Sequence, residues 1–313
     1  MRTDVQRVAL VGAGVIGNAW AAHLLAHGLE VRVSDPDPGA ADRLCRDVER
    51  ALPVLESLGL STDGWDQRLR FTDLSTALDG ADLVQENGPE RVDVKTAIMA
   101  EVDGLTPADV VIASSSSSMT PSQLAAMCPR HPERVIVGHP FNPVYLIPLV
   151  EVVGHAGTSA AVIEAAMAFY TRVGKRPVHV RQEVPGHLAN RLQAALWREA
   201  YSLVERGVAS VADLDAAIAH GPGLRWALLG PLANQHLSGG DRGLAHVLAH
   251  LGPPTQELMD DLGSVKLTPQ LATALVEGVH EELDGVPVGT LAAQRDALLV
   301  GLLTAKSRVE ALP

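Results

Sequence analysis

A histidine and a glutamate near the middle of the chain are the residues best suited to acid–base chemistry. His139 follows the apolar run Arg134–Gly138, and Glu151 lies on the next apolar run, Leu149–Val153. The segment Phe141-Asn142-Pro143 is expected to turn the chain, so that two adjacent strand ends bring imidazole and carboxylate into contact. The carboxylate would fix the tautomer of the histidine and stabilise the imidazolium while the histidine moves a proton. Taken alone, His139 is more often an ordinary loop histidine, so its interpretation depends on its surroundings.

Two further polar positions could hold the oxygen of a substrate. The run Ser114–Ser118 follows another apolar segment. It either forms a self-hydrogen-bonding loop that leads into a helix cap at Thr120, or supplies a hydroxyl to a substrate oxygen. Asn190 opens a predicted helix, where asparagine is usually a cap, with a substrate contact as the alternative.

The first 35 residues have the order of elements that a dinucleotide site requires. The apolar run Val8–Val11 leads into Gly12-Ala13-Gly14-Val15-Ile16-Gly17, a helical stretch follows, and a second apolar run, Val31–Val33, precedes Asp35. The first glycine permits a tight turn, the second lets the backbone approach a pyrophosphate, and the third lets helix and strand pack closely. The helix N-terminus then offers free N–H groups to the phosphates.

Asp35 indicates which dinucleotide is bound. Its carboxylate can accept both ribose hydroxyls of NAD, whereas a 2′-phosphate would meet its charge, and no neighbouring arginine could receive that phosphate. The sequence therefore predicts NAD rather than NADP or FAD. Beside a nicotinamide the catalytic interpretation of His139 is favoured, because alcohol oxidation needs a base near pH 7.

The pattern along the chain predicts an α/β part that alternates strands and helices, implying parallel strands. Beyond the two strands at the glycine-rich segment, strands are expected at residues 81–84, 110–113, 134–138, 149–153 and 177–180. Helices are expected at residues 91–102, 121–127 and 159–173, and a long helix or helix pair at about 39–60, kinked or divided at Pro53. Thr120 is the expected cap of the helix at 121, with Gln123 reaching back to it.

Past Pro185-Gly186 only helical patterns remain. They cover about residues 187–207, 212–220, 241–251, 269–282 and 289–305, separated by the breakers Gly221-Pro222-Gly223, Gly230-Pro231 and Gly252-Pro253-Pro254. The sequence therefore predicts a Rossmann-type NAD-binding domain over residues 1–184 and an all-α domain over residues 185–313.

Composition excludes several classes of partner. The chain has 313 residues and a net charge of −12, which argues against nucleic acid, and no Lys/Arg cluster offsets that charge. No apolar run approaches the length of a bilayer and no signal peptide is recognised, so no membrane partner is expected. Cys45 and Cys128 are interpreted as reduced structural residues, which favours a cytoplasmic location.

Two histidine pairs have the i,i+4 spacing of metal ligands on predicted helices. They are His23/His27 and His246/His250. Neither has an obvious third ligand, and hydride chemistry requires no metal, so no metal site is predicted.

Taken together, these segments resemble the 3-hydroxyacyl-CoA dehydrogenase superfamily over essentially the whole chain. The resemblance rests on the order and spacing of the glycine fingerprint, Ser114–Met119, His139-Pro140-Phe141-Asn142-Pro143, Glu151 and Asn190-Arg191-Leu192. It implies that His139 is the general base and Glu151 its partner. It also implies that Ser117 and Asn190 hold the substrate oxygen.

The resemblance implies two further cofactor contacts and a dimer. Glu90 and Lys95 match positions near the nicotinamide and its ribose, although by spacing alone they would be solvated helix charges. If the match between this serine run and the family motif is shifted by one residue, Ser116 or Ser118 takes the role of Ser117. The helical domain would close one side of the substrate cleft and form much of a homodimer interface.

Within that superfamily the second domain resembles the small-acid branch, which includes L-gulonate 3-dehydrogenase, the lambda-crystallins and L-carnitine dehydrogenase. The segments Asn142–Glu151 and Leu196–Ala200 resemble the carnitine enzymes, whereas Gly230-Pro231-Leu232 and His236-Leu237 resemble the gulonate enzymes.

Arg225 supports a free acid as substrate, because its planar guanidinium suits a carboxylate. A surface arginine in a loop is the alternative. Phe141, Trp197 and Trp226 lie in or beside the motif segments, and aromatic faces would suit a quaternary ammonium. Trp197 and Tyr201, four apart on one helix, could equally pack in a core or a dimer.

The sequence therefore predicts an NAD-dependent dehydrogenase that oxidises a small L-3-hydroxy carboxylic acid, of the L-carnitine or L-gulonate type, to the 3-oxo acid. One alternative is a 3-hydroxyacyl-CoA or acyl-carrier substrate. Another is a non-catalytic, crystallin-like NAD-binding protein.

Overall fold

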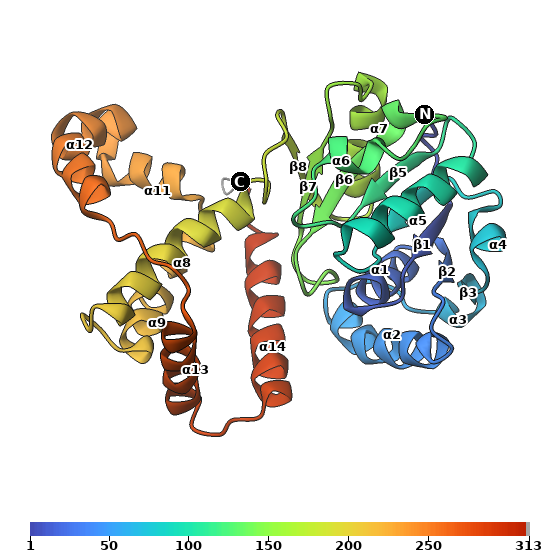
Figure 1. The fold of residues 1–313 in the computed structure, drawn as a ribbon. Helices are drawn as coiled ribbons and strands as arrows, with labels where there is room; N and C mark the ends of the chain where they lie inside the picture. The colour runs from blue at the N-terminus through green and yellow to red at the C-terminus, as the bar shows by residue number, and fades with distance from the viewer. Residues whose placement is uncertain (311–313) are drawn as a thin grey trace. The chain divides into compact units, whose positions relative to one another are not determined.

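The computed structural model describes residues 1–310 and divides the chain into two compact units, Met1–Arg191 and a second that begins at Leu192. Figure 1 shows a sheet covered by helices in the first unit; the described part of the second contains helices but no strand. The predicted fold class, an α/β Rossmann-type part followed by an all-α part, is confirmed. The division between the units lies after Arg191, later than the expected boundary after residue 184.

An eight-stranded sheet with the order β3-β2-β1-β4-β5-β6-β7-β8 forms the centre of the first unit. The order of its first six strands is that of a doubly wound dinucleotide-binding fold. Every neighbouring pair is parallel except β6 and β7, which are antiparallel. The strands are β1 Arg7–Val11, β2 Glu30–Ser34, β3 Leu69–Phe71, β4 Leu83–Glu86, β5 Val111–Ser114, β6 Val135–Pro140, β7 Leu149–Val153 and β8 Arg176–Val180.

Helices cover both faces of this sheet, so its central strands are apolar on both sides. Val8 and Leu10 of β1 belong to a core that also takes side chains from α1, α2 and α7. Ala9 and Val11 point to the other face and join a core with α4, α5 and α6. The helical elements of this unit are α1 Val15–Ala26, α2 Ala40–Ser57, α3 Trp65–Arg68, α4 Leu74–Leu78, α5 Val92–Leu105, α6 Pro121–Ala125, η1 Pro132–Arg134 and α7 Ala160–Arg172.

Two expectations about this unit were wrong. The strands are not all parallel, since β7 runs back along β6. His139 does not follow a strand but lies within β6, which extends to Pro140. Of the two alternatives expected at about residues 39–60, the single long helix is present as α2, with Pro53 inside it. The helix is exposed there, so water can bind the carbonyl that proline leaves unpaired. The short strand β3 was not predicted.

The expected cap at Thr120 is confirmed. Its hydroxyl accepts a hydrogen bond from the Gln123 N–H, and the Gln123 side chain accepts one from the Thr120 N–H, which completes a capping box. This cap ends the serine run at the edge of the sheet and starts α6 directly after it.

The second unit consists of helices joined by short turns. Two short helices, α10 and α11, were not predicted, and Pro253 and Pro254 lie inside α12 rather than ending a helix. The surface of α12 is exposed around these prolines, so water can take the freed carbonyls. The elements are α8 Ala189–Glu205, α9 Val211–Ala219, α10 Pro222–Trp226, α11 Pro231–Ser238, η2 Gly240–Arg242, α12 Gly243–Asp261, α13 Pro269–Leu283 and α14 Val288–Lys306.

Within residues 1–310 no single helix is long and apolar enough to cross a membrane. One pair, α13 and α14, passes that test only when joined, and it is bent by 70° at the break between the helices.

Gly138, directly before His139, has no room for a side chain. A Cβ there would overlap the Tyr170 hydroxyl, which donates a hydrogen bond of 2.6 Å to the Gln85 side chain. We predict that Gly138→Ala lowers the free energy of unfolding, measured in urea, by about 1–3 kcal/mol. The matched control is Gly104→Ala in α5, where a Cβ meets no atom within 4 Å and alanine should be neutral or stabilising. Equal effects of the two substitutions would contradict this account.

Candidate active site

The glycine-rich segment after β1 has the geometry that a pyrophosphate needs. Gly12 has a φ of +102°, and a Cβ there would lie 2.8 Å from the Asn87 carbonyl. A Cβ at Gly17 would overlap the Gly12 carbonyl oxygen, whereas one at Gly14 meets nothing within 4 Å. The two outer glycines are therefore needed by the fold itself, and the open face at Gly14 is available to a ligand.

Asp35 lies directly after β2 and is tied to the same segment. One carboxylate oxygen accepts a 2.7 Å hydrogen bond from the Ala13 N–H, and the other accepts one of 2.9 Å from the Asp37 N–H. A carboxylate has about four lone-pair positions, so acceptor capacity remains for ribose hydroxyls. The residues present thus fit NAD. Val15 and Ile16 begin α1 beside this segment, and Val15 is 70% exposed.

His139 and Glu151 lie directly opposite each other in the antiparallel pair β6–β7. His139 Nδ1 is 2.9 Å from a carboxylate oxygen of Glu151, and both residues are buried. The ring of Phe141 packs edge-on against His139, with ring centroids 5.0 Å apart. Because a carboxylate only accepts, Nδ1 carries the proton in the neutral ring and Nε2 is left as the basic nitrogen.

The other oxygen of Glu151 holds the start of α8. It accepts hydrogen bonds of 2.8 and 2.9 Å from the N–H groups of Leu188 and Ala189. Burial alone would raise the pKa of Glu151, but the bonds from His139 and these two amides outweigh it and the pKa lies below its ordinary value. Glu151 is therefore a carboxylate near neutral pH.

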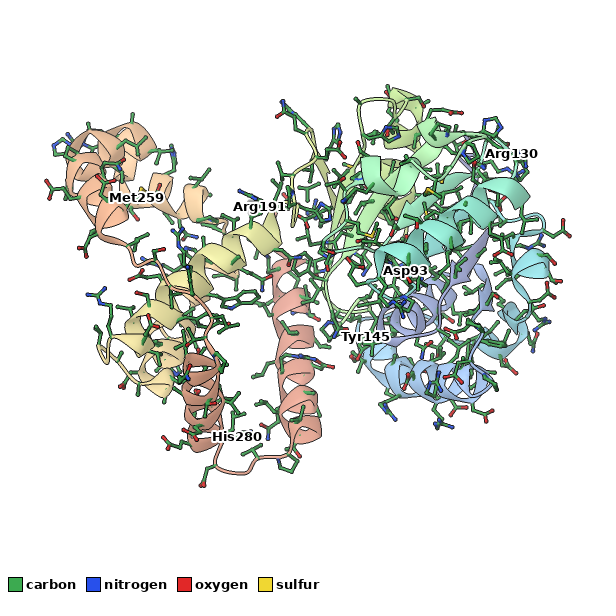
Figure 2. The ribbon with its side chains drawn as sticks, viewed as in Figure 1. Asp93, Arg130, Tyr145, Arg191, Met259 and His280 are labelled. Carbon is green, nitrogen blue, oxygen red and sulfur yellow. The ribbon has the colours of Figure 1, made fainter. Side chains whose placement is uncertain are left out.

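Asn190 lies inside the first turn of α8 rather than at its cap, so the cap interpretation of this residue was wrong. The amides ahead of it are bound by Glu151 instead. Its side chain is half-buried and forms no hydrogen bond with the described residues. Figure 2 labels Arg191, the next residue, at the start of α8.

Glu90 organises the serine run at the end of β5. One of its oxygens accepts hydrogen bonds from the hydroxyls of Ser116 and Ser118, at 2.5 and 2.8 Å, and from the N–H groups of Ser117 and Ser118. Burial would raise the pKa of Glu90, but these bonds and the charge of Lys95 lower it overall. The Ser117 side chain is exposed, and its hydroxyl has no hydrogen-bond partner within residues 1–310.

Lys95 is not a solvated helix charge, and that alternative was wrong. Its ammonium is buried and lies 2.9 and 3.0 Å from the two carboxylate oxygens of Glu86, and 2.9 Å from the Gly88 carbonyl oxygen. Glu90 lies 3.6 Å from the same nitrogen. Lys95 thus forms ion pairs with two acids, Glu86 and Glu90.

Sequence reasoning missed Glu86 and His187. Glu86 ends β4 and accepts a 2.5 Å hydrogen bond from the Ser114 hydroxyl in addition to Lys95. An acid two residues after the strand predicted at residues 81–84 was a visible signal for it. His187 is buried with its ring 5.2 Å from that of His139, and no spacing pattern in the sequence indicated this contact.

Three sequence-predicted substrate residues belong to the second unit. Trp197, 46% exposed, lines a cavity of about 390 Å³ together with Tyr201, Asp215 and His280 of helices α8, α9 and α13. Figure 2 labels His280 on α13. Arg225 and Trp226 end α10 and are exposed, and the Arg225 guanidinium has no ion-pair partner among the described residues.

The histidine pairs have other partners. His23 is buried with Nε2 2.7 Å from the Val173 carbonyl oxygen, and His246 Nε2 accepts from Arg242 at 2.8 Å. Within residues 1–310 no group of three or more His, Cys, Asp or Glu side chains is arranged to hold a metal ion.

We predict that Glu151→Gln lowers kcat by about 10²- to 10⁴-fold while KM for NAD stays unchanged. The glutamine amide can face His139 with an N–H, which would place the imidazole proton on the wrong nitrogen. Steady-state kinetics together with a circular-dichroism melt separate this effect from unfolding. A kcat within threefold of wild type would contradict the role of Glu151.

The lowered pKa of Glu151 also predicts a pH dependence of stability. A carboxyl whose pKa is lower in the folded chain stabilises the fold above its ordinary pKa of 4.5. That contribution is lost as the pH falls through the lower, folded value. Urea titrations should therefore show a difference between wild type and Glu151→Gln at pH 6 that shrinks below pH 4.5. A difference that grows with acidity would contradict the prediction.

Comparison with known proteins gives two adjoining family matches. Residues 7–184 match the 3-hydroxyacyl-CoA dehydrogenase NAD-binding domain, and residues 186–273 match the C-terminal domain of the same family. Among curated relatives, the chain is 48% identical to an L-carnitine dehydrogenase of Streptomyces coelicolor, over 98% of this chain and 96% of that one. It is 44% identical to a 3-hydroxyacyl-CoA dehydrogenase of Gibberella moniliformis, over 100% and 98%.

Solved structures agree with these matches. A 5-formyl-3-hydroxy-2-methylpyridine 4-carboxylic acid 5-dehydrogenase superposes with a TM-score of 0.84 at 29% identity, over 97% of this chain and 99% of that one. The (S)-3-hydroxybutyryl-CoA dehydrogenase of Ralstonia eutropha gives 0.65 at 29% identity, over 82% and 89%. The chain belongs to the 3-hydroxyacyl-CoA dehydrogenase family and is an NAD-dependent oxidoreductase.

Proposed function

We propose that this protein oxidises L-carnitine, a small L-3-hydroxy acid, to the corresponding 3-oxo acid with NAD. The observation that carries the proposal is near-full-length identity of 42–48% to L-carnitine dehydrogenases from several bacteria. The arrangement of His139, Glu151 and the glycine-rich segment supports the same reaction.

NAD supplies the acceptor for the hydride that leaves C3 of the substrate. Gly12–Gly17 would bind the pyrophosphate, Asp35 the ribose hydroxyls, and Glu90 and Lys95 would support the nicotinamide end. His139 Nε2 takes the hydroxyl proton as the hydride departs, and the Glu151 carboxylate at Nδ1 stabilises the imidazolium that forms.

Ser117 and Asn190 would hold the reacting oxygen. Of the serines 116–118, Ser117 is the one whose hydroxyl is not engaged by Glu90. The amide of Asn190 has a free N–H to donate in the first turn of α8. Two donors at this oxygen would hold the substrate hydroxyl in position for transfer of its proton to His139.

Arg225 would bind the substrate carboxylate, since its exposed guanidinium can form two parallel bonds with it. Phe141, Trp197 and Trp226 would supply aromatic faces for a quaternary ammonium. A cytoplasmic location accords with a nicotinamide cofactor and with Cys45 and Cys128, which are both unpaired.

We predict that initial rates of NAD reduction at mildly alkaline pH are highest with L-carnitine. L-gulonate and L-3-hydroxybutyrate test other small acids, and NADH oxidation by acetoacetyl-CoA tests the activity named for the Gibberella relative. Turnover only with the CoA ester would overturn the proposal. Turnover only with L-gulonate would support a free acid as the substrate class but overturn the assignment of L-carnitine as the substrate.

We predict that Arg225→Met raises KM for the acid by about 10- to 100-fold and leaves KM for NAD unchanged, because a charge-assisted pair of bonds is lost. The matched control is Arg295→Met, which removes an exposed arginine of α14 that pairs with Asp296. That control should leave both KM values unchanged. An unaltered KM for the acid in Arg225→Met would remove the carboxylate assignment.

We further propose a homodimer formed through the helical unit. Among its described apolar side chains only Leu271 is buried, whereas Leu192, Leu232, Leu258 and Leu298 are 65–77% exposed. A helical unit with so little core of its own needs a further apolar surface to cover it. Light scattering after gel filtration should give twice the 33.0 kDa chain mass. A monomer at micromolar concentration would contradict the dimer.

A further inference from the structure

His187 occupies a strained and buried position beside the catalytic pair. It lies between β8 and α8 with a φ of +52°, a left-handed conformation that costs a histidine about 1–2 kcal/mol. Its side chain is nonetheless only 1% exposed. Strain of this kind persists where surrounding contacts enforce it, and it gathers at functional sites.

Three contacts enforce the position. His187 Nε2 is 3.1 Å from the carbonyl oxygen of Ser116 in the serine run. The ring itself lies 5.2 Å from that of His139, at an angle of 49°. The next two residues, Leu188 and Ala189, donate their N–H groups to Glu151. The segment 187–189 therefore touches the serine run, the base and the partner of the base at once.

The contact to Ser116 determines the tautomer of His187. A carbonyl oxygen only accepts, so Nε2 must carry the hydrogen and Nδ1 is left as a bare acceptor. Nδ1 is buried and has no hydrogen-bond partner among the described residues. A proton on Nδ1 would bury an unpaired cationic N–H, which is far costlier than an unpaired lone pair.

The surroundings of His187 shift the pKa of its ring in both directions. Burial lowers its pKa and so does His139, whereas the Ser116 carbonyl, Glu151 and Glu90 raise it, and the pKa lies below its ordinary value overall. Because its pKa lies below the ordinary value of 6.5, the His187 ring is neutral at pH 7 and above.

We propose that His187 is a positioning residue of this dehydrogenase. Its neutral, Nε2-protonated ring fixes the serine run against the base, and it leaves the imidazolium that forms on His139 without a second cation beside it. The inference rests on the proposed function for the roles of His139 and Ser117, but the protonation state of His187 does not depend on which substrate is used.

The first test is the tautomer itself. Long-range ¹H–¹⁵N spectra of the full-length protein labelled at histidine identify the His187 signals by their loss in His187→Gln. We expect the neutral, Nε2-protonated pattern throughout pH 7–9, with and without NADH. An imidazolium or an Nδ1-protonated ring at pH 7 would overturn the proposal, whatever substrate the enzyme proves to use.

The second test separates the hydrogen bond from simple packing. His187→Phe keeps an aromatic ring beside His139 and removes the donor to Ser116, whereas His187→Gln keeps a donor and removes the ring. We expect kcat/KM for the acid to be about tenfold lower in His187→Phe than in wild type, with KM for NAD unchanged. In His187→Gln, which keeps a donor, we expect kcat/KM to lie between those of His187→Phe and wild type. Full activity in His187→Phe would mean that the ring only fills space.

Melting temperatures of both variants, measured by circular dichroism, show whether either fails to fold. If wild type turns over none of the acids offered, the proposed function fails while the spectra still decide the state of His187. If the acid is oxidised but the ring is charged, only the positioning role fails.

Discussion

The hydrogen bond between His139 and Glu151 is the interaction on which the rest of the site depends. It exists because β7 turns back along β6 and pairs these two residues across the strands. The remaining oxygen of Glu151 accepts from the amides that begin α8. One buried carboxylate therefore fixes the tautomer of the base and the start of the next helix together.

A second acid, Glu90, fixes the serine run through hydrogen bonds, as Glu151 fixes the base. Its oxygen gathers the hydroxyls of Ser116 and Ser118, so that the exposed Ser117 is left as the hydroxyl free for a ligand. The buried ammonium of Lys95 lies close to both Glu90 and Glu86 and offsets part of their charge. This arrangement tolerates several acids at one edge of the sheet because each has a cation or several donors close by.

The sequence predicted the features that depend on local rules. The glycine segment and the Thr120 capping box follow from backbone sterics and neighbouring hydrogen bonds, so they were visible in the residues. The antiparallel pairing of β6 and β7 could not be predicted, because an apolar run indicates a strand without indicating the direction in which that strand pairs. The continuation of α12 through Pro253 and Pro254 depends on exposure to water. His187 could not be found because its partners lie 71 and 48 positions away, at Ser116 and His139.

The most direct test of the catalytic account is the turnover of His139→Asn with L-carnitine and NAD, measured beside the binding of NADH by fluorescence. Asparagine fits the buried position and can still bond to Glu151, but it cannot accept the hydroxyl proton. The account predicts that NADH binds as in wild type while kcat falls by at least about 10²-fold across pH 7–9. A variant that binds NADH and keeps wild-type turnover would show that His139 is not the base.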